Sequence, residues 1–156
     1  MNFENLVTEL KEFEREKILF VGLGNEYRGD DGAGLVFLEE IKKNEEFASS
    51  NFIQAGRNPE NHLLEIIRLK PQIVVFIDAA EYSEEPGTIS FLSSKQINSL
   101  GISTHAFSIK LIEKFLLNEQ QMEFRYLCIQ PQSTKFREEL SEAVSESIKE
   151  FFMLGV

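Results

Sequence analysis

The sequence predicts an α/β fold, a three-layer α/β/α sandwich in which a mostly parallel sheet lies between two layers of helices. Short apolar runs recur along the chain without polar alternation, as expected for strands that are covered on both faces. Segments with apolar residues at every third or fourth position separate these runs, as helices that connect parallel strands do. The 156 residues, 42% of them hydrophobic, fit one domain with one compact core.

Five segments of the chain have the pattern of strands. The third is the most hydrophobic and ends on Asp78. Turn residues Glu85, Pro86 and Gly87 precede the fourth, which we expect to pair antiparallel with the strand before it or to lie at an edge. The predicted strands are residues 18–23, 51–55, 73–77, 88–92 and 124–129.

Five helices are predicted from apolar periodicity and from capping residues. An apolar stripe formed by Phe3, Leu6, Leu10 and Phe13 predicts an N-terminal helix over about residues 2–15. The second helix is expected to end near residue 43, after the first strand and its loop. The remaining three are expected to begin at Asn58 and Pro59, at Ser103 or Thr104, and at Ser133 or Thr134.

Charge and cysteine content exclude several classes of function. The 26 acidic and 16 basic residues give a formal charge of −10, which would repel nucleic acid and anionic membranes, so a protein or a small cation is the better partner. Cys128 is the only cysteine, so no internal disulfide and no paired-cysteine zinc site can form. The first 16 residues contain no uninterrupted apolar run of the kind found in signal peptides. We therefore expect a cytoplasmic protein without membrane insertion.

The loop after the first predicted strand suits a cation better than a nucleotide. Gly22 and Gly24 begin a dinucleotide-like turn, but Tyr27 stands where the third glycine would be needed. Asp30 and Asp31 would repel a pyrophosphate at the start of the next helix. Two carboxylates between glycines can instead bind a divalent metal, whose other ligands would be oxygen or imidazole nitrogen.

Further ligands are expected at the carboxyl ends of the strands, where ligands bind in open α/β sheets. Asp78 ends the most apolar strand, and His105 lies at a predicted helix start. Each also has a purely structural interpretation, because adjacent acids favour a helix N-terminus and a strand-terminal Asp is often a turn residue. We interpret His62 as a surface residue and Cys128 as a buried hydrophobe rather than a nucleophile. Residues 25–31, 56–58, 78 and 130 complete the strand-end candidates.

Several short motifs occur along the chain in the order Gly22-Leu23-Gly24-Asn25, Asp30-Asp31-Gly32-Ala33-Gly34, Pro59-Glu60-Asn61, Asp78-Ala79-Ala80, Pro86-Gly87-Thr88, Ser103-Thr104-His105 and Ile129-Gln130-Pro131. With these motifs the chain resembles the hydrogenase maturation endopeptidases, which trim the C-terminal tail from the large subunit of nickel-iron hydrogenases. The resemblance spans about residues 18–131, and it is strongest to the branch serving hydrogenases of the formate-hydrogenlyase or energy-converting type. It implies a single domain over residues 1–156 with a twisted five-stranded sheet, and leaves the N-terminal helix as an addition.

The resemblance also implies an aspartic-type or metal-dependent endopeptidase with a site formed by Asp31, Asp78 and His105. Some relatives have Glu at the first of these positions. In one interpretation these residues are catalytic: a bound metal polarises the scissile carbonyl, and Asp31 or Asp78 acts as the base. In the other, which we favour, the nickel comes with the hydrogenase precursor, and the three residues are ligands that recognise it, with Asp30 and Asn25 supporting the loop. The alternative function is a nickel-dependent chaperone that docks on the precursor without cutting it. A small-molecule hydrolase or phosphorylase is disfavoured, because only Arg28 and Arg57 lie near the strand ends.

Overall fold

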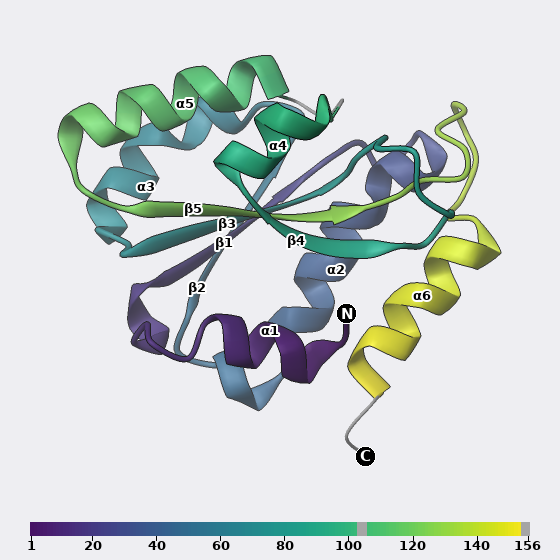
Figure 1. Ribbon diagram of the computed structural model, residues 1–156, viewed down its shortest axis with the longest axis horizontal. Coiled ribbons are helices and arrows are strands. Elements are labelled where there is room, and N and C mark those ends of the chain that lie inside the picture. Colours follow the sequence, from purple (N-terminus) through teal and green to yellow (C-terminus); the bar gives the residue numbers. More distant parts are fainter. Residues whose placement is uncertain (103–105, 154–156) are drawn as a thin grey trace.

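A central sheet of five strands runs through the molecule (Figure 1). The computed structural model describes residues 1–102 and 106–153, with backbone alone for residues 106–108. All five predicted strands are present. The third extends to Ala79, past the predicted range of 73–77, and the fourth begins one residue later than expected. The strands are β1 (Ile18–Leu23), β2 (Asn51–Gly56), β3 (Ile73–Ala79), β4 (Ile89–Ser93) and β5 (Glu123–Ile129).

The sheet has the order β2-β1-β3-β5-β4. Three pairings are parallel, and β4 lies at one edge, antiparallel to β5. Every residue of β1 and β3 is buried, which explains why these strands read as continuous apolar runs. Exposed or partly exposed residues occur in β2 and β4 because these are the edge strands. The predicted mostly parallel α/β fold is therefore confirmed.

Helices cover both faces of the sheet and divide the apolar core into two clusters (Figure 1). Successive residues of a strand point to opposite faces, so Ile73, Val75 and Ile77 join one cluster and Val74 and Phe76 join the other. The first cluster lies under α1 (Phe3–Glu9), α2 (Ala33–Lys42) and α6 (Glu142–Met153). The second lies under α3 (Leu63–Leu69), α4 (Ser94–Leu100) and α5 (Ala106–Glu119). Within the described residues, no helix is long and apolar enough to cross a membrane.

Three of the predicted helices differ in extent and one helix was not predicted. The helix expected to begin at Asn58 and Pro59 starts as the 3₁₀ helix Pro59–His62 and becomes α-helical only at Leu63. The N-terminal helix expected over about residues 2–15 ends at Glu9, although Leu6 and Leu10 are buried as the stripe required. The last helix begins at Glu142 and not at Ser133 or Thr134, so residues 130–141 form a long loop. Helix α4, with Ile97 as its buried residue, has too few apolar positions to give a clear periodic signal.

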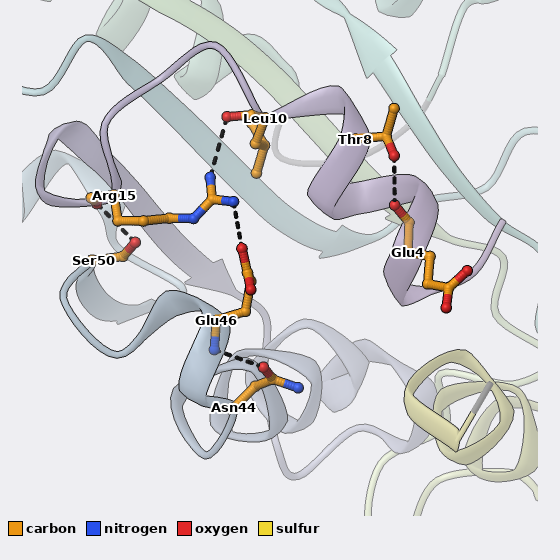
Figure 2. A network of polar contacts seen from close by, with 7 residues as sticks. All are labelled: Glu4, Thr8, Leu10, Arg15, Asn44, Glu46 and Ser50. Atoms are coloured by element: carbon orange, nitrogen blue, oxygen red, sulfur yellow. Dashed lines mark hydrogen bonds and ion pairs between the residues drawn. The ribbon is translucent and has the colours of Figure 1, made fainter. Parts of the chain in front are cut away.

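Arg15 joins the segment after α1 to the rest of the protein (Figure 2). Its guanidinium donates to the carbonyl of Leu10 at 3.2 Å and to the carboxylate of Glu46 at 2.6 Å. It also lies 4.8 Å from the centre of the Phe47 ring, and the Ser50 hydroxyl donates to the Arg15 carbonyl at 2.8 Å. By capping the Leu10 carbonyl, Arg15 stabilises the turn that ends the N-terminal helix early.

We expect Arg15→Ala to lower the free energy of unfolding by about 1–2 kcal/mol, since it removes a carbonyl cap, a cation–π contact and a partly exposed ion pair. Urea denaturation measures the change. Arg15→Lys is the matched control: it keeps the charge but cannot bridge both acceptors, so it should recover only part of the loss. Full recovery by lysine would mean that charge alone matters at this position.

Candidate functional site

The order of the strands points to a crevice between the carboxyl ends of β1 and β3. From β1 the chain proceeds to β2 on one side and then returns to β3 on the other. Ligands of open α/β proteins bind at such a reversal of strand order. The loop after β1 carries Asp30 and Asp31, and β3 carries Asp78 one residue before its end. Three of the predicted site residues therefore lie beside the crevice that the topology selects.

Asp30 fixes the acidic loop to the long loop before α6. It is fully buried. Its carboxylate accepts hydrogen bonds from the backbone N–H groups of Gln132 at 2.8 Å, Ser133 at 3.2 Å and Ser141 at 2.7 Å. The Ser141 hydroxyl donates to it as well, at 2.8 Å. The expected supporting role of Asp30 thus has a structural basis, since four donors from a distant segment satisfy one buried carboxylate.

Asp31 has a fixed backbone and a partly exposed side chain. It lies in the short 3₁₀ helix Gly29–Gly32, just before α2. The N–H of Asn25 donates to the Asp31 carbonyl at 2.9 Å, and the Asn25 side chain accepts from the N–H of Tyr27 at 3.0 Å. At Gly24, whose φ is +134°, a Cβ atom would lie 2.0 Å from the same carbonyl oxygen. Gly24 of the dinucleotide-like motif therefore permits the close approach of this loop.

Gly34 brings the start of α2 against the ends of both central strands. A Cβ atom at this position would lie 2.4 Å from the carbonyl oxygens of Leu23 in β1 and Ile77 in β3. Only glycine permits this approach. Because Gly34 follows Asp31 by three residues and Ile77 precedes Asp78, the contact holds the two acidic residues at the same edge of the sheet.

Asp78 points to the face of the sheet that α3, α4 and α5 cover. It alternates with Val74 and Phe76, which belong to the core cluster on that face, and it is 5% exposed. Its neighbour in the sheet is Cys128 of β5. Burial, with a smaller contribution from the charge of Asp78, raises the pKa of the Cys128 thiol to about 12. This supports the interpretation of Cys128 as a buried hydrophobe, since a thiol that stays protonated is a poor nucleophile.

The third predicted ligand, His105, lies outside the described residues, so its part in the site stays a prediction. Helix α5 begins at Ala106 and packs on the face to which Asp78 points. Across residues 1–102 and 106–153, no group of three or more His, Cys, Asp or Glu side chains could hold a metal ion.

Comparison with known protein families identifies the chain. A family model described as HycI, hydrogenase maturation protease, matches residues 36–154. The chain belongs to the hydrogenase maturation proteases. The match includes β3 with Asp78 and begins five residues after Asp31. The protein is accordingly a hydrolase that acts as a protease.

Individual relatives agree with this family. The chain is 28% identical over 131 residues to the hydrogenase 3 maturation protease of Escherichia coli K12, and the alignment covers 81% of each chain. Among solved structures, it is similar to the nickel-iron hydrogenase maturation protease HycI of Thermococcus kodakarensis, with a TM-score of 0.80, 26% identity, and coverage of 93% of this chain and 92% of the other. The fold is also that of the maturating endopeptidase HybD of E. coli, with a TM-score of 0.71, 19% identity and 85% coverage of both chains.

Gln130 organises the segment that follows Asp78 in this protease. It is 3% exposed. Its side-chain carbonyl accepts from the N–H groups of Tyr82 at 3.0 Å and Glu84 at 3.2 Å, and its side-chain amide donates to the carboxylate of Glu81 at 2.9 Å. The sequence placed Gln130 among the strand-end candidates without a role. The sequence signal for its role is an amide side chain directly after an apolar strand, because such a group is buried and needs hydrogen-bond partners.

We expect the native protease to resist alkylation at Cys128. At pH 8 the raised pKa leaves almost no thiolate, so iodoacetamide should modify the folded protein more than about a hundredfold more slowly than the urea-unfolded one. Intact-mass spectrometry over time measures both rates. Rapid modification of the folded protein would show that the thiol is accessible and ionised.

The raised pKa of Cys128 also implies that the stability contributed by the protonated thiol is present below pH of about 9 and is lost as the pH rises towards 12.

Proposed function

We propose that this protease removes the C-terminal tail from the nickel-loaded precursor of a nickel-iron hydrogenase large subunit, and that Asp31, Asp78 and His105 recognise the nickel. The observation that carries the proposal is the position of two acidic residues from separate elements, Asp31 and Asp78, beside the crevice between β1 and β3. The similarity to a protease named for nickel-iron hydrogenase supports the choice of substrate.

The donor set suits nickel that arrives with the substrate. Carboxylate oxygen and imidazole nitrogen are both ligands that divalent nickel accepts. Two carboxylates and one imidazole leave its coordination shell incomplete, so they bind it weakly until ligands from the precursor complete the shell. Nickel held this way would register the tail for cleavage and could polarise the scissile carbonyl. In this protease Asp31 and Asp78 bind and orient, while Asp30 and Gly34 hold the two carboxylates in place.

The fixed backbone around Asp31 fits a recognition role. Its carbonyl is hydrogen-bonded to Asn25, and its loop is tied down through Asp30, so a ligand meets a site that is already ordered. The partly exposed side chain can be reached by a large protein substrate. The proposal places the reaction in the cytoplasm, where a single unpaired cysteine is stable.

The purified protease should be mixed with nickel-loaded and with nickel-free large-subunit precursor, and the mass of the precursor followed over time. We expect loss of the C-terminal tail only from the nickel-loaded form. Asp31→Asn, Asp78→Asn and His105→Ala should each slow cleavage by at least about a hundredfold if the residue is a ligand. His62→Ala is the matched control, because His62 is the other histidine and its ring contacts the exposed Glu65 at 3.2 Å.

Each alternative has its own outcome. Nickel-dependent binding of the precursor without shortening would replace the protease role by that of a docking chaperone. Equal cleavage of both precursor forms would remove nickel recognition. Cleavage at the normal rate in the Asp78→Asn and His105→Ala variants would mean that the proposed site is wrong.

A further inference from the structure

Three adjoining cavities form a trough along the outer side of the acidic loop. The first, of about 170 Å³, begins at Gly24 and Asn25, beside the edge strand β2. The second, of about 200 Å³, shares Glu26 and Leu35 with the first. The third, of about 260 Å³, shares Leu140 with the second and lies between α2 and α6. Neighbouring cavities share lining residues and so lie side by side, and we call the three together the trough.

The trough has an apolar floor and a rim on which three carboxylates outnumber the two basic side chains, Arg57 and Lys149, that line its two ends. Leu35, Val36 and Leu140 form the floor of its middle part, and Glu26 and Glu39 stand beside them. Glu39 pairs with Lys42 at 3.6 Å, an exposed contact that contributes little and that a cation from a partner can displace. Glu40, which pairs in the same way with Lys43 at 3.2 Å, adds a third carboxylate where the trough continues towards α6. Apolar side chains flanked by basic ones would complement this surface.

The trough meets the proposed site at Gly24. This glycine lines the first cavity, and its backbone lies against the carbonyl of Asp31. Asn25 lines the same cavity and donates its N–H to that carbonyl. A polypeptide lying in the trough therefore passes directly beside the backbone of the loop that presents Asp31.

We propose that the trough binds an extended, apolar and basic segment of the precursor polypeptide and guides it towards the loop that carries Asp31. The inference rests on the proposed function and adds the chemistry of the bound segment. The acidic rim favours this occupant over a second copy of the chain, because the formal charge of −10 makes two copies repel each other. The apolar floor supplies contact area, and the rim selects the charge of the partner.

A charge-reversed variant, Glu26→Lys combined with Glu39→Lys, tests the trough. Both carboxylates are exposed, so the variant should fold. With nickel-loaded precursor we expect KM to rise about tenfold while kcat changes less than about twofold, because the rim acts on binding. Glu119→Lys is the matched control: Glu119 ends α5, on the opposite face of the sheet, and its reversal should leave KM unchanged.

A second measurement separates the trough from the cleavage activity. Fluorescence anisotropy would follow the binding of a short labelled peptide of alternating leucine and arginine, and of its counterpart with glutamate in place of arginine. The wild type and Glu119→Lys should bind the arginine peptide equally, the double variant about tenfold more weakly, and none should bind the glutamate peptide. A wild type that binds this peptide but never cleaves the precursor would refute the proposed function and leave the trough standing.

Three results would overturn the trough proposal. The double variant could keep the KM and the peptide affinity of the wild type. Glu119→Lys could lose as much affinity as the double variant, which would reduce the effect to net charge. Sedimentation could reveal wild-type dimers that the double variant loses, in which case the trough would hold a second copy of the chain.

Discussion

Replacing Gly34 with alanine is expected to lower the free energy of unfolding by about 3 kcal/mol or more. The new Cβ would lie 2.4 Å from two backbone carbonyl oxygens, those of Leu23 and Ile77. Neither oxygen can move without displacing a central strand, so α2 must shift away from the sheet. Guanidinium denaturation measures the loss, and cleavage should fall with it because the short helix that carries Asp31 leads directly into α2.

Gly101→Ala is the matched control for this substitution. Gly101 ends α4 with φ +60° and has open space around the position of a Cβ atom. Alanine there strains only the backbone, at a cost of about 1 kcal/mol. Equal losses from both substitutions would show that α2 tolerates displacement and that the close approach of Gly34 does not fix the site.

Asp30→Ala is expected to cost about 3 kcal/mol of stability and to abolish cleavage. The substitution leaves three backbone N–H groups and the Ser141 hydroxyl without their acceptor in a buried place. Amide hydrogen exchange should accelerate over residues 132–141, since these bonds close that loop, and urea denaturation gives the change in free energy.

Ser141→Ala provides the graded comparison for Asp30. It removes the hydroxyl donor but keeps the backbone N–H, so we expect a loss of about 1 kcal/mol and only local acceleration of exchange. If Asp30→Ala and Ser141→Ala behaved alike, the carboxylate would not be the organising group of the two loops.

The strands could be predicted because their signal is local. Every residue of β1 and β3 is buried, and a strand covered on both faces must be apolar throughout. The start of α6 could not be predicted. Ser133 and Thr134 have the composition of helix caps, but the Ser133 N–H is bound by Asp30, which lies far away in the sequence. The end of α1 depends on Arg15 in the same way, through a side chain that lies beyond the helix.

In the candidate site, too, the local features could be predicted from the sequence and the long-range contacts could not. Strand-end reasoning placed Asp31 and Asp78 at one edge of the sheet, and the structure agrees, because parallel strands expose their carboxyl ends together. Asp30 and Gln130 support the site through hydrogen bonds between segments that are remote in the chain. The apolar periodicity of the sequence contains no information about such contacts. A residue pattern indicates that a buried polar group needs partners but does not say which segment supplies them.

The bonds of Asp30 also set an order of events during synthesis. Its donors lie 102, 103 and 111 residues further along the chain. Ribosomes add about 5–20 residues per second, so these donors emerge several seconds after the acidic loop itself. A nascent chain that has completed all five strands still lacks Ser141, and its acidic loop stays unanchored. The acidic loop therefore gains these bonds only after the segment that follows β5 has been made, when the sheet has had time to form.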